Sequence, residues 1–148
     1  MAVRVQREDF DLGAELDALR AGREDIGALV SFTGLVRGGA VATMELEHYP
    51  GMTEKAQAAI EAQARDRWPL QASLIVHRYG ALAPGEQIMM VATASAHRQA
   101  AFEAAEFLMD YLKSRAPFWK KESTPDGGRW VDAREEDEAA LGRWDRRT

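Results

Sequence analysis

The residues most able to do chemistry lie in one stretch, residues 109–121, which reads MDYLKSRAPFWKK. It carries four cationic side chains with no acidic one between them: Lys113, Arg115, Lys120 and Lys121. The whole chain of 148 residues has a formal net charge of -5, so this cluster opposes the overall charge. A local positive field beside apolar residues attracts anions. The sequence therefore predicts a bound anion here.

Lys113 follows the apolar Leu112 and lies one turn beyond Met109, at the border of the apolar stripe of a predicted helix. An ammonium held there is partly desolvated, which suits an amine to acid–base or nucleophilic work. The position also has an ordinary explanation, because a lysine in the last turn complements the helix dipole. The residue alone does not decide between these interpretations.

Lys120 follows the aromatic pair Phe118 and Trp119, which we expect to anchor a short strand. An inward-pointing aromatic ring would hold Lys120 in a fixed place, and an ordinary solvated lysine is the alternative. Lys121 has the opposite strand parity, so it is expected to face away from Lys120. Lys120 is therefore the better candidate of the two.

Three further residues could bind an anion. His97 and Arg98 fall in the first turn of the same predicted helix, where the dipole disfavours cations unless an anion is drawn to the free N–H groups. A solvated surface pair is the alternative. Arg37 precedes two glycines that let a backbone approach a ligand closely, although this motif matches no standard phosphate loop.

The composition excludes several classes of protein. The chain has no cysteine, which rules out disulfides, thiolate metal sites and cysteine nucleophiles. Its three scattered histidines predict no metal site, and His48 and His77 are expected to be structural. No apolar run approaches the ~20 residues of a membrane span, and the N-terminus lacks a signal-peptide core. We expect a cytoplasmic protein that binds neither membrane nor, given its acidic balance, nucleic acid.

Hydrophobic periodicity predicts a single α+β domain over residues 1–148, with a mostly antiparallel sheet and helices packed on it. Asp11 is expected to cap the first helix and Ser95 the long third one, which ends before Pro117. The predicted strands are residues 3–5, 26–36 (with a bend at Gly34), 43–49, 73–79, 87–94, 119–123 and 129–131. The predicted helices are residues 12–21, 53–68 and 96–115, with a short one ending near Trp144.

Two helices have an expected buried face. For residues 53–68 it consists of Ala56, Ala59, Ile60, Ala64 and Trp68. For residues 96–115 it consists of Ala101, Ala105, Leu108 and Leu112, widened by Phe102 and Met109.

Several motifs, in order along residues 3–144, resemble the large, catalytic subunit of molybdopterin synthase. They are SFTGLVR (31–37), EHYPGM (47–52), SAHR (95–98), MDYLK (109–113) and APFWKKE (116–122). The resemblance implies an α/β-hammerhead fold and a homodimer of large subunits at the core of a heterotetramer. Each large subunit would hold a small ubiquitin-like sulfur-carrier subunit.

The same resemblance implies a reaction. The small subunit's C-terminal Gly-Gly tail, carried as a thiocarboxylate, would thread into the large subunit. Two sulfurs would pass in turn to cyclic pyranopterin monophosphate and form the dithiolene of molybdopterin. The sulfur donor would be a protein, so no dissociable cofactor is implied.

By resemblance, Lys113 and Lys120 are the catalytic residues. Both would also contact substrate, together with Arg37, His97 and Arg98 in a phosphate and pterin pocket. Arg37 is the residue we expect a neighbouring protomer to contribute. Phe32 and Met109 would line the channel for the partner's tail.

Two alternatives use the same cationic residues. A non-catalytic binding module would hold an acidic tail or a phosphorylated ligand without turnover. A small phosphate-ester enzyme would use lysine and histidine as acid–base groups and would need no protein donor.

Overall fold

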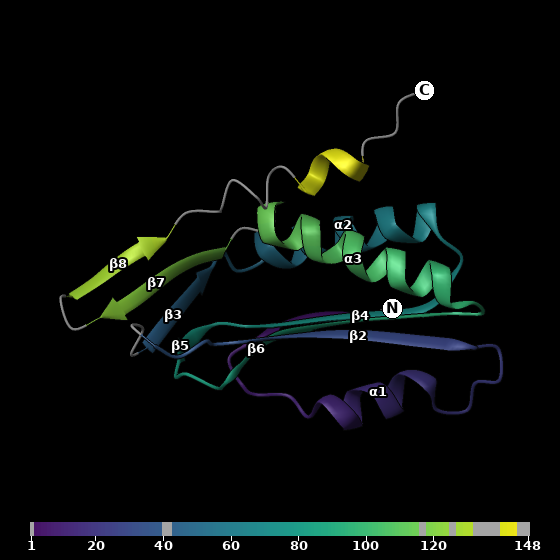
Figure 1. Ribbon diagram of the computed structural model, residues 1–148, viewed down its shortest axis with the longest axis horizontal. Helices are drawn as coiled ribbons and strands as arrows, with labels where there is room; N and C mark the ends of the chain where they lie inside the picture. The colour runs from purple at the N-terminus through teal and green to yellow at the C-terminus, as the bar shows by residue number, and fades with distance from the viewer. Residues whose placement is uncertain (1, 40–42, 116–117, 125–126, 132–139, 145–148) are drawn as a thin grey trace.

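A four-stranded sheet at the centre of the molecule carries the three helices (Figure 1). The computed structural model describes residues 2–39, 43–115, 118–124, 127–131 and 140–144. Its strands are β1 (Ala2–Gln6), β2 (Ala28–Leu35), β3 (Thr43–His48), β4 (Leu70–Arg78), β5 (Gly80–Leu82), β6 (Gln87–Ser95), β7 (Phe118–Thr124) and β8 (Gly127–Val131). Its helices are α1 (Leu12–Arg20), α2 (Met52–Arg67), α3 (Arg98–Arg115) and the short 3-10 helix η1 (Gly142–Trp144).

The central sheet has the strand order β1-β4-β6-β2. β1 pairs with β4 in parallel, and the other two pairings are antiparallel. β6 was expected to be a central strand buried on both faces, and this is confirmed. The expected bend at Gly34 is a register shift between Gly34 and Leu35.

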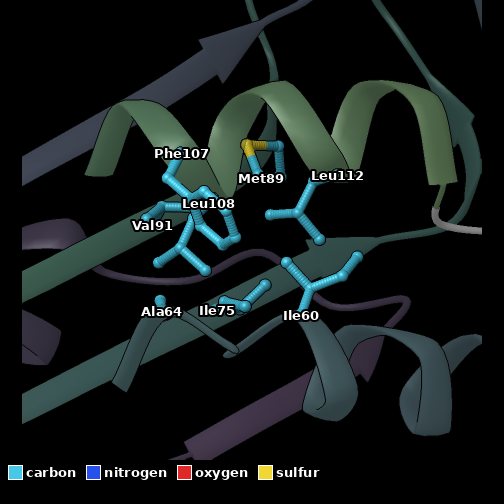
Figure 2. Packing of buried hydrophobic residues seen from close by; sticks show 8 residues of the cluster. All are labelled: Ile60, Ala64, Ile75, Met89, Val91, Phe107, Leu108 and Leu112. Atoms are coloured by element: carbon cyan, nitrogen blue, oxygen red, sulfur yellow. The ribbon is translucent and has the colours of Figure 1, made fainter. Parts of the chain in front are cut away.

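The two faces of this sheet build two cores because successive strand residues point to opposite sides. α2 and α3 cover one face, and α1 covers the other (Figure 1). Under α2 and α3 lies the larger cluster, drawn in Figure 2: Ile60, Ala64, Ile75, Met89, Val91, Phe107, Leu108 and Leu112. Under α1 lies the second: Phe10, Leu74, Val76, Met90 and Ala92.

A second sheet, of order β5-β3-β7-β8, is antiparallel throughout the described residues. β3 alternates as expected, because Met44 and Leu46 are buried while Glu45 and Glu47 are exposed. The expected hairpin of β7 and β8 is confirmed, although its turn at residues 125–126 lies outside the described residues. Together the sheets and helices confirm the expected α+β class with mostly antiparallel pairing.

Three local expectations were wrong. On α2, Ala59 is exposed and Ala56 is only half-buried, because Thr53, Gln57 and Glu61 occupy the buried face beside Ile60 and Ala64. On α3, Phe102 is 60% exposed while Phe107 is fully buried. Both errors arise because alanine fits either side of a helix, so its spacing does not identify the buried face.

The third error concerns the start of α3. Ser95 is the last residue of β6, and its hydroxyl donates to the carbonyl of His97 instead of accepting from the helix. The helix begins at Arg98 and ends at Arg115, while Pro117 lies outside the described residues. Asp11, in contrast, caps α1 as expected, with Ala14 N–H donating to its Oδ1 over 3.0 Å.

No helix among the described residues has the length and apolar character needed to cross a membrane.

Candidate functional site

The last turn of α3 fixes Lys113. Its neighbour Leu112 belongs to the core cluster and is 7% exposed, whereas Lys113 itself is exposed. The helix therefore holds the lysine's backbone against the core and presents its side chain at the surface. Arg115, two residues after Lys113, is also exposed. Its Nη1 donates a hydrogen bond of 3.3 Å to the carbonyl oxygen of Ser114.

β7 carries the second lysine. Phe118 pairs with His48 of β3, and Lys120 pairs with Leu46. Side chains two residues apart on a strand share a face, so Lys120 lies on the Phe118 side of the sheet. Lys120 is half-buried beside the buried Leu46. The side chain of Lys121 lies outside the described residues.

Phe118 connects this sheet to the central one. Its ring stacks on His77 of β4 with centroids 3.7 Å apart and an interplanar angle of 19°. His48 lies 6.3 Å from Phe118 and 4.2 Å from Tyr79, centroid to centroid. Burial lowers the pKa of His77 to about 4, and electrostatic interactions with Lys113 and His48 are smaller causes in the same direction. The charge of Lys113 thus acts on His77, and Lys120 lies on the same face of β7 as Phe118.

His97 and Arg98 lie at the opposite end of α3, and both are exposed. His97 lines a pocket of about 260 Å³ between the end of α2 and the start of α3. The other lining residues are Trp68, Pro69, Gln71, Ser95, Ala96, Gln99, Ala100 and Glu103. Glu103 accepts hydrogen bonds from Gln99 Nε2 and Trp68 Nε1, each with a donor–acceptor distance of 3.0 Å, and these bonds lower the pKa of its carboxyl group.

Arg37 lies directly after β2 and is exposed. The preceding residue, Val36, is buried and pinned to the 84–86 turn, because its N–H donates to Glu86 and its carbonyl accepts from Gly85. The β2–β6 register sets Leu35 opposite Gln87 and Ala28 opposite Ser95. Arg37 is therefore at the far end of the central sheet from His97.

Apart from Arg37, the predicted catalytic and substrate-binding residues fall into two groups within one chain. Lys113 and Lys120 gather around Phe118, while His97 and Arg98 stand a helix length away. An α-helix rises 1.5 Å per residue, so the 18 residues of α3 span about 27 Å. One copy of the chain does not bring the two groups into a single pocket.

The two residues expected to line a tail channel lie on neighbouring elements. Phe32 is on the edge strand β2 and is 43% exposed. Met109 is on α3, half-buried, and packs against the core cluster. An exposed ring on an edge strand remains available for a partner chain.

The sequence did not predict the ring contacts that Phe118 makes with His77 and His48. Their strands are far apart in the sequence, and only the β3–β7 register brings Phe118 opposite His48. Both histidines were interpreted as structural, and that interpretation did not connect them to Lys113. Among the described residues, no cluster of three or more metal-ligating side chains occurs.

Residues 5–115 match the family model described as MoaE protein. The chain is 63% identical over 146 residues to the molybdopterin synthase catalytic subunit of Cereibacter sphaeroides, covering 97% of this chain and 100% of that protein.

Solved structures of proteins in this family are also similar to the chain. The molybdopterin biosynthesis MoaE protein from Burkholderia ambifaria is 60% identical, with a TM-score of 0.84, and the match covers 97% of this chain and 98% of that one. A protein–protein complex of subunits 1 and 2 of the molybdopterin-converting factor from Helicobacter pylori contains a chain with a TM-score of 0.73 at 20% identity, covering 90% of each. At that identity the likeness concerns the fold alone.

Proposed function

This chain belongs to the MoaE family of molybdopterin synthase catalytic subunits, and we propose that it transfers sulfur to a pterin substrate. The donor is the C-terminal thiocarboxylate of a small ubiquitin-like subunit. The acceptor is cyclic pyranopterin monophosphate, which gains two sulfurs in turn and becomes the dithiolene of molybdopterin.

The observation that carries this proposal is the placement of Lys113 and Lys120 around one aromatic stack. Donor and substrate are both anions, so cationic groups that converge on one place hold them together and stabilise developing negative charge. Lys113, at the exposed helix end, meets the thiocarboxylate. Lys120, half-buried beside Leu46, holds the substrate and the anionic intermediate.

A second copy of the chain completes the site. His97 and Arg98 lie too far along α3 to reach Lys113 of the same protomer, yet His97 lines a pocket with room for part of a small ligand, and Arg98 is the next residue. The free N–H groups at the start of α3 suit a phosphate. The phosphate end of the substrate therefore binds to His97 and Arg98 of one protomer while the reacting end approaches the lysines of the other. Arg37 borders this shared pocket.

The protein partner occupies the surface beside Phe32 and Met109. A half-exposed aromatic ring and a flexible thioether accommodate a narrow Gly-Gly tail without requiring hydrogen bonds from side chains.

The chain works as one domain in the cytoplasm without a resident cofactor of its own. The partly buried Ile88 packs against both the core under α2 and α3 and the core of the second sheet, so the two sheets share one interior.

Reconstitution tests the proposal. The purified chain is mixed with a thiocarboxylated small subunit and cyclic pyranopterin monophosphate, and the dithiolene product is measured. Product is expected with the wild-type chain and not with Lys113→Ala. Absence of product from the wild-type chain would overturn the proposal. Tight binding of the small subunit without turnover would instead support a binding module.

A further inference from the structure

A row of rings joins the two sheets. His77 of β4 stacks on Phe118 of β7, and His48 of β3 continues the row to Tyr79. The guanidinium of Arg7 closes it, 4.9 Å from the centroid of the Tyr79 ring. This row bridges the end of β4 to Phe118, the first residue of β7, which lies five positions after Lys113 in the sequence.

The protonation state of His77 is set by its surroundings. Its Nδ1 lies 2.8 Å from the carbonyl oxygen of Arg78. A carbonyl only accepts hydrogen bonds, so Nδ1 carries the proton and donates it, and Nε2 of the neutral ring keeps its lone pair. Burial lowers the pKa of the ring to about 4, against a smaller opposing effect of the Arg78 hydrogen bond. His77 is therefore uncharged at neutral pH.

The charges around His77 come from several elements. Lys113 of α3 and His48 of β3 act on the ring and disfavour a second positive charge there. The guanidinium of Arg78 is directed elsewhere, because its Nε donates to Arg7 and its Nη1 donates to Gln87. A neutral ring thus lets the ammonium of Lys113 remain nearby without repulsion.

Lys113 is braced from two directions. Leu112, directly before it, is held in the core under α3. Phe118, a few residues after it, is held by the face-to-face stack on His77. These two anchors lie on either side of Lys113 in the sequence, and small displacements of a reacting group lower the rate strongly.

We propose that His77 is a positioning residue for Lys113, which its neutral, stacked ring keeps in place for reaction with the donor tail. This inference rests on the proposed function for the role of Lys113. His77 itself touches neither substrate nor donor and exchanges no proton with them.

Two substitutions distinguish the effect of the flat ring of His77 from the effect of its polar nitrogen atoms. His77→Phe keeps a flat ring on Phe118 and lacks the Nδ1 donor, whereas His77→Asn keeps a donor near the Nδ1 position and lacks the ring. We expect His77→Asn to lower kcat by about 10- to 100-fold with little change in KM, and His77→Phe to stay within a factor of about three of wild type. Tyr79→Phe, which preserves every ring in the row, is the matched control and should behave as wild type.

A spectroscopic measurement tests the contact without turnover. Nitrogen-15 NMR of the imidazole should show the neutral Nδ1–H form over roughly pH 5 to 8, and Lys113→Met should move the titration of His77 to higher pH. An unchanged titration in Lys113→Met, or wild-type kcat in His77→Asn, would overturn the inference.

The two proposals fail in different ways. If the wild-type chain makes no product, the proposed function fails, and the NMR titration still decides whether His77 and Lys113 interact. If His77→Asn does not fold, as judged by circular dichroism, the comparison of His77→Phe with wild type and the Lys113→Met titration decide the inference.

Discussion

Arg98 and Lys113 lie near opposite ends of one helix, with about 22 Å of helical rise between them. Both are exposed cations, and both are proposed to act on the same substrate. These statements agree if the substrate lies between two copies of the chain, each of which presents a different end of α3.

Mixing two defective variants tests this arrangement. Lys113→Ala and Arg98→Ala are each expected to be nearly inactive. After subunit exchange, a mixed dimer has one site that combines intact Lys113 from one protomer with intact Arg98 from the other. Statistical mixing should then restore about a quarter of wild-type activity per site. No recovery, despite mixed dimers detected by native mass spectrometry, would mean that each chain supplies both residues to its own site.

The two lysines should differ in how they affect turnover. Lys113→Ala is expected to lower kcat by about 10²- to 10³-fold, since it removes a charge that stabilises the reacting thiocarboxylate. Lys120→Ala is expected both to lower kcat and to raise KM for the pterin, because Lys120 also holds the substrate. Single-turnover and steady-state assays separate the two effects.

Arg115→Ala is the matched control for these lysine variants. Arg115 is an exposed cation in the same last turn of α3, and no role in the reaction is proposed for it. Its loss should leave both kinetic constants within about twofold of wild type. A decrease as large as that of Lys113→Ala would show that general positive charge, and not the position of Lys113, matters.

Gln57 offers a test of stability away from the site. Its side chain on α2 is fully buried, and neither amide atom has a hydrogen-bond partner among the described residues. A buried amide without partners costs about 1 to 3 kcal/mol, so Gln57→Leu is expected to raise the free energy of unfolding by about that much. Urea denaturation measures the change. Gln63→Leu, an exposed position on the same helix, should have almost no effect.

The low pKa of His77 predicts how stability depends on pH. The unfolded chain takes up a proton on this ring near pH 6.5, while the native ring resists protonation until about pH 4. The unfolded state therefore binds more protons in that window, so stability is full above pH 6.5 and falls as the pH is lowered toward 4. His77→Phe should remove this part of the slope in urea titrations. An identical slope in the variant would show that His77 takes up its proton at the same pH in the native and unfolded states.

Local patterns in the sequence were enough to predict most elements of the fold. The alternation of β3, the apolar run of β6 and the cap at Asp11 each depend on neighbouring residues, and each is confirmed. β5 was not predicted, because three residues between Tyr79 and the Pro84 turn carry too little pattern to distinguish a strand from a loop. The exposed Phe102 and the buried Phe107 show a second limit, since periodicity in an alanine-rich helix allows more than one buried face.

The candidate site was predictable only in part. Lys113 and Lys120 stand out by charge and spacing, and the resemblance assigned their roles. His77 did not stand out, because its contact with Phe118 depends on how β4 and β7 of different sheets meet. That meeting is a non-local consequence of strand register, which single-residue patterns do not encode. The separation of His97 from Lys113 within one chain follows already from the predicted helix over residues 96–115, and the length of α3 confirms it.

The continuity of α3 constrains which insertions the protein can tolerate. Each residue of an α-helix turns the chain by about 100°, so one residue added between Ala104 and Leu108 would rotate Lys113 away from His77 while Arg98 stayed in place. Four added residues would nearly restore the direction of Lys113 but lengthen the helix by about 6 Å. The angular phase between the two ends of this helix is therefore fixed together with its length.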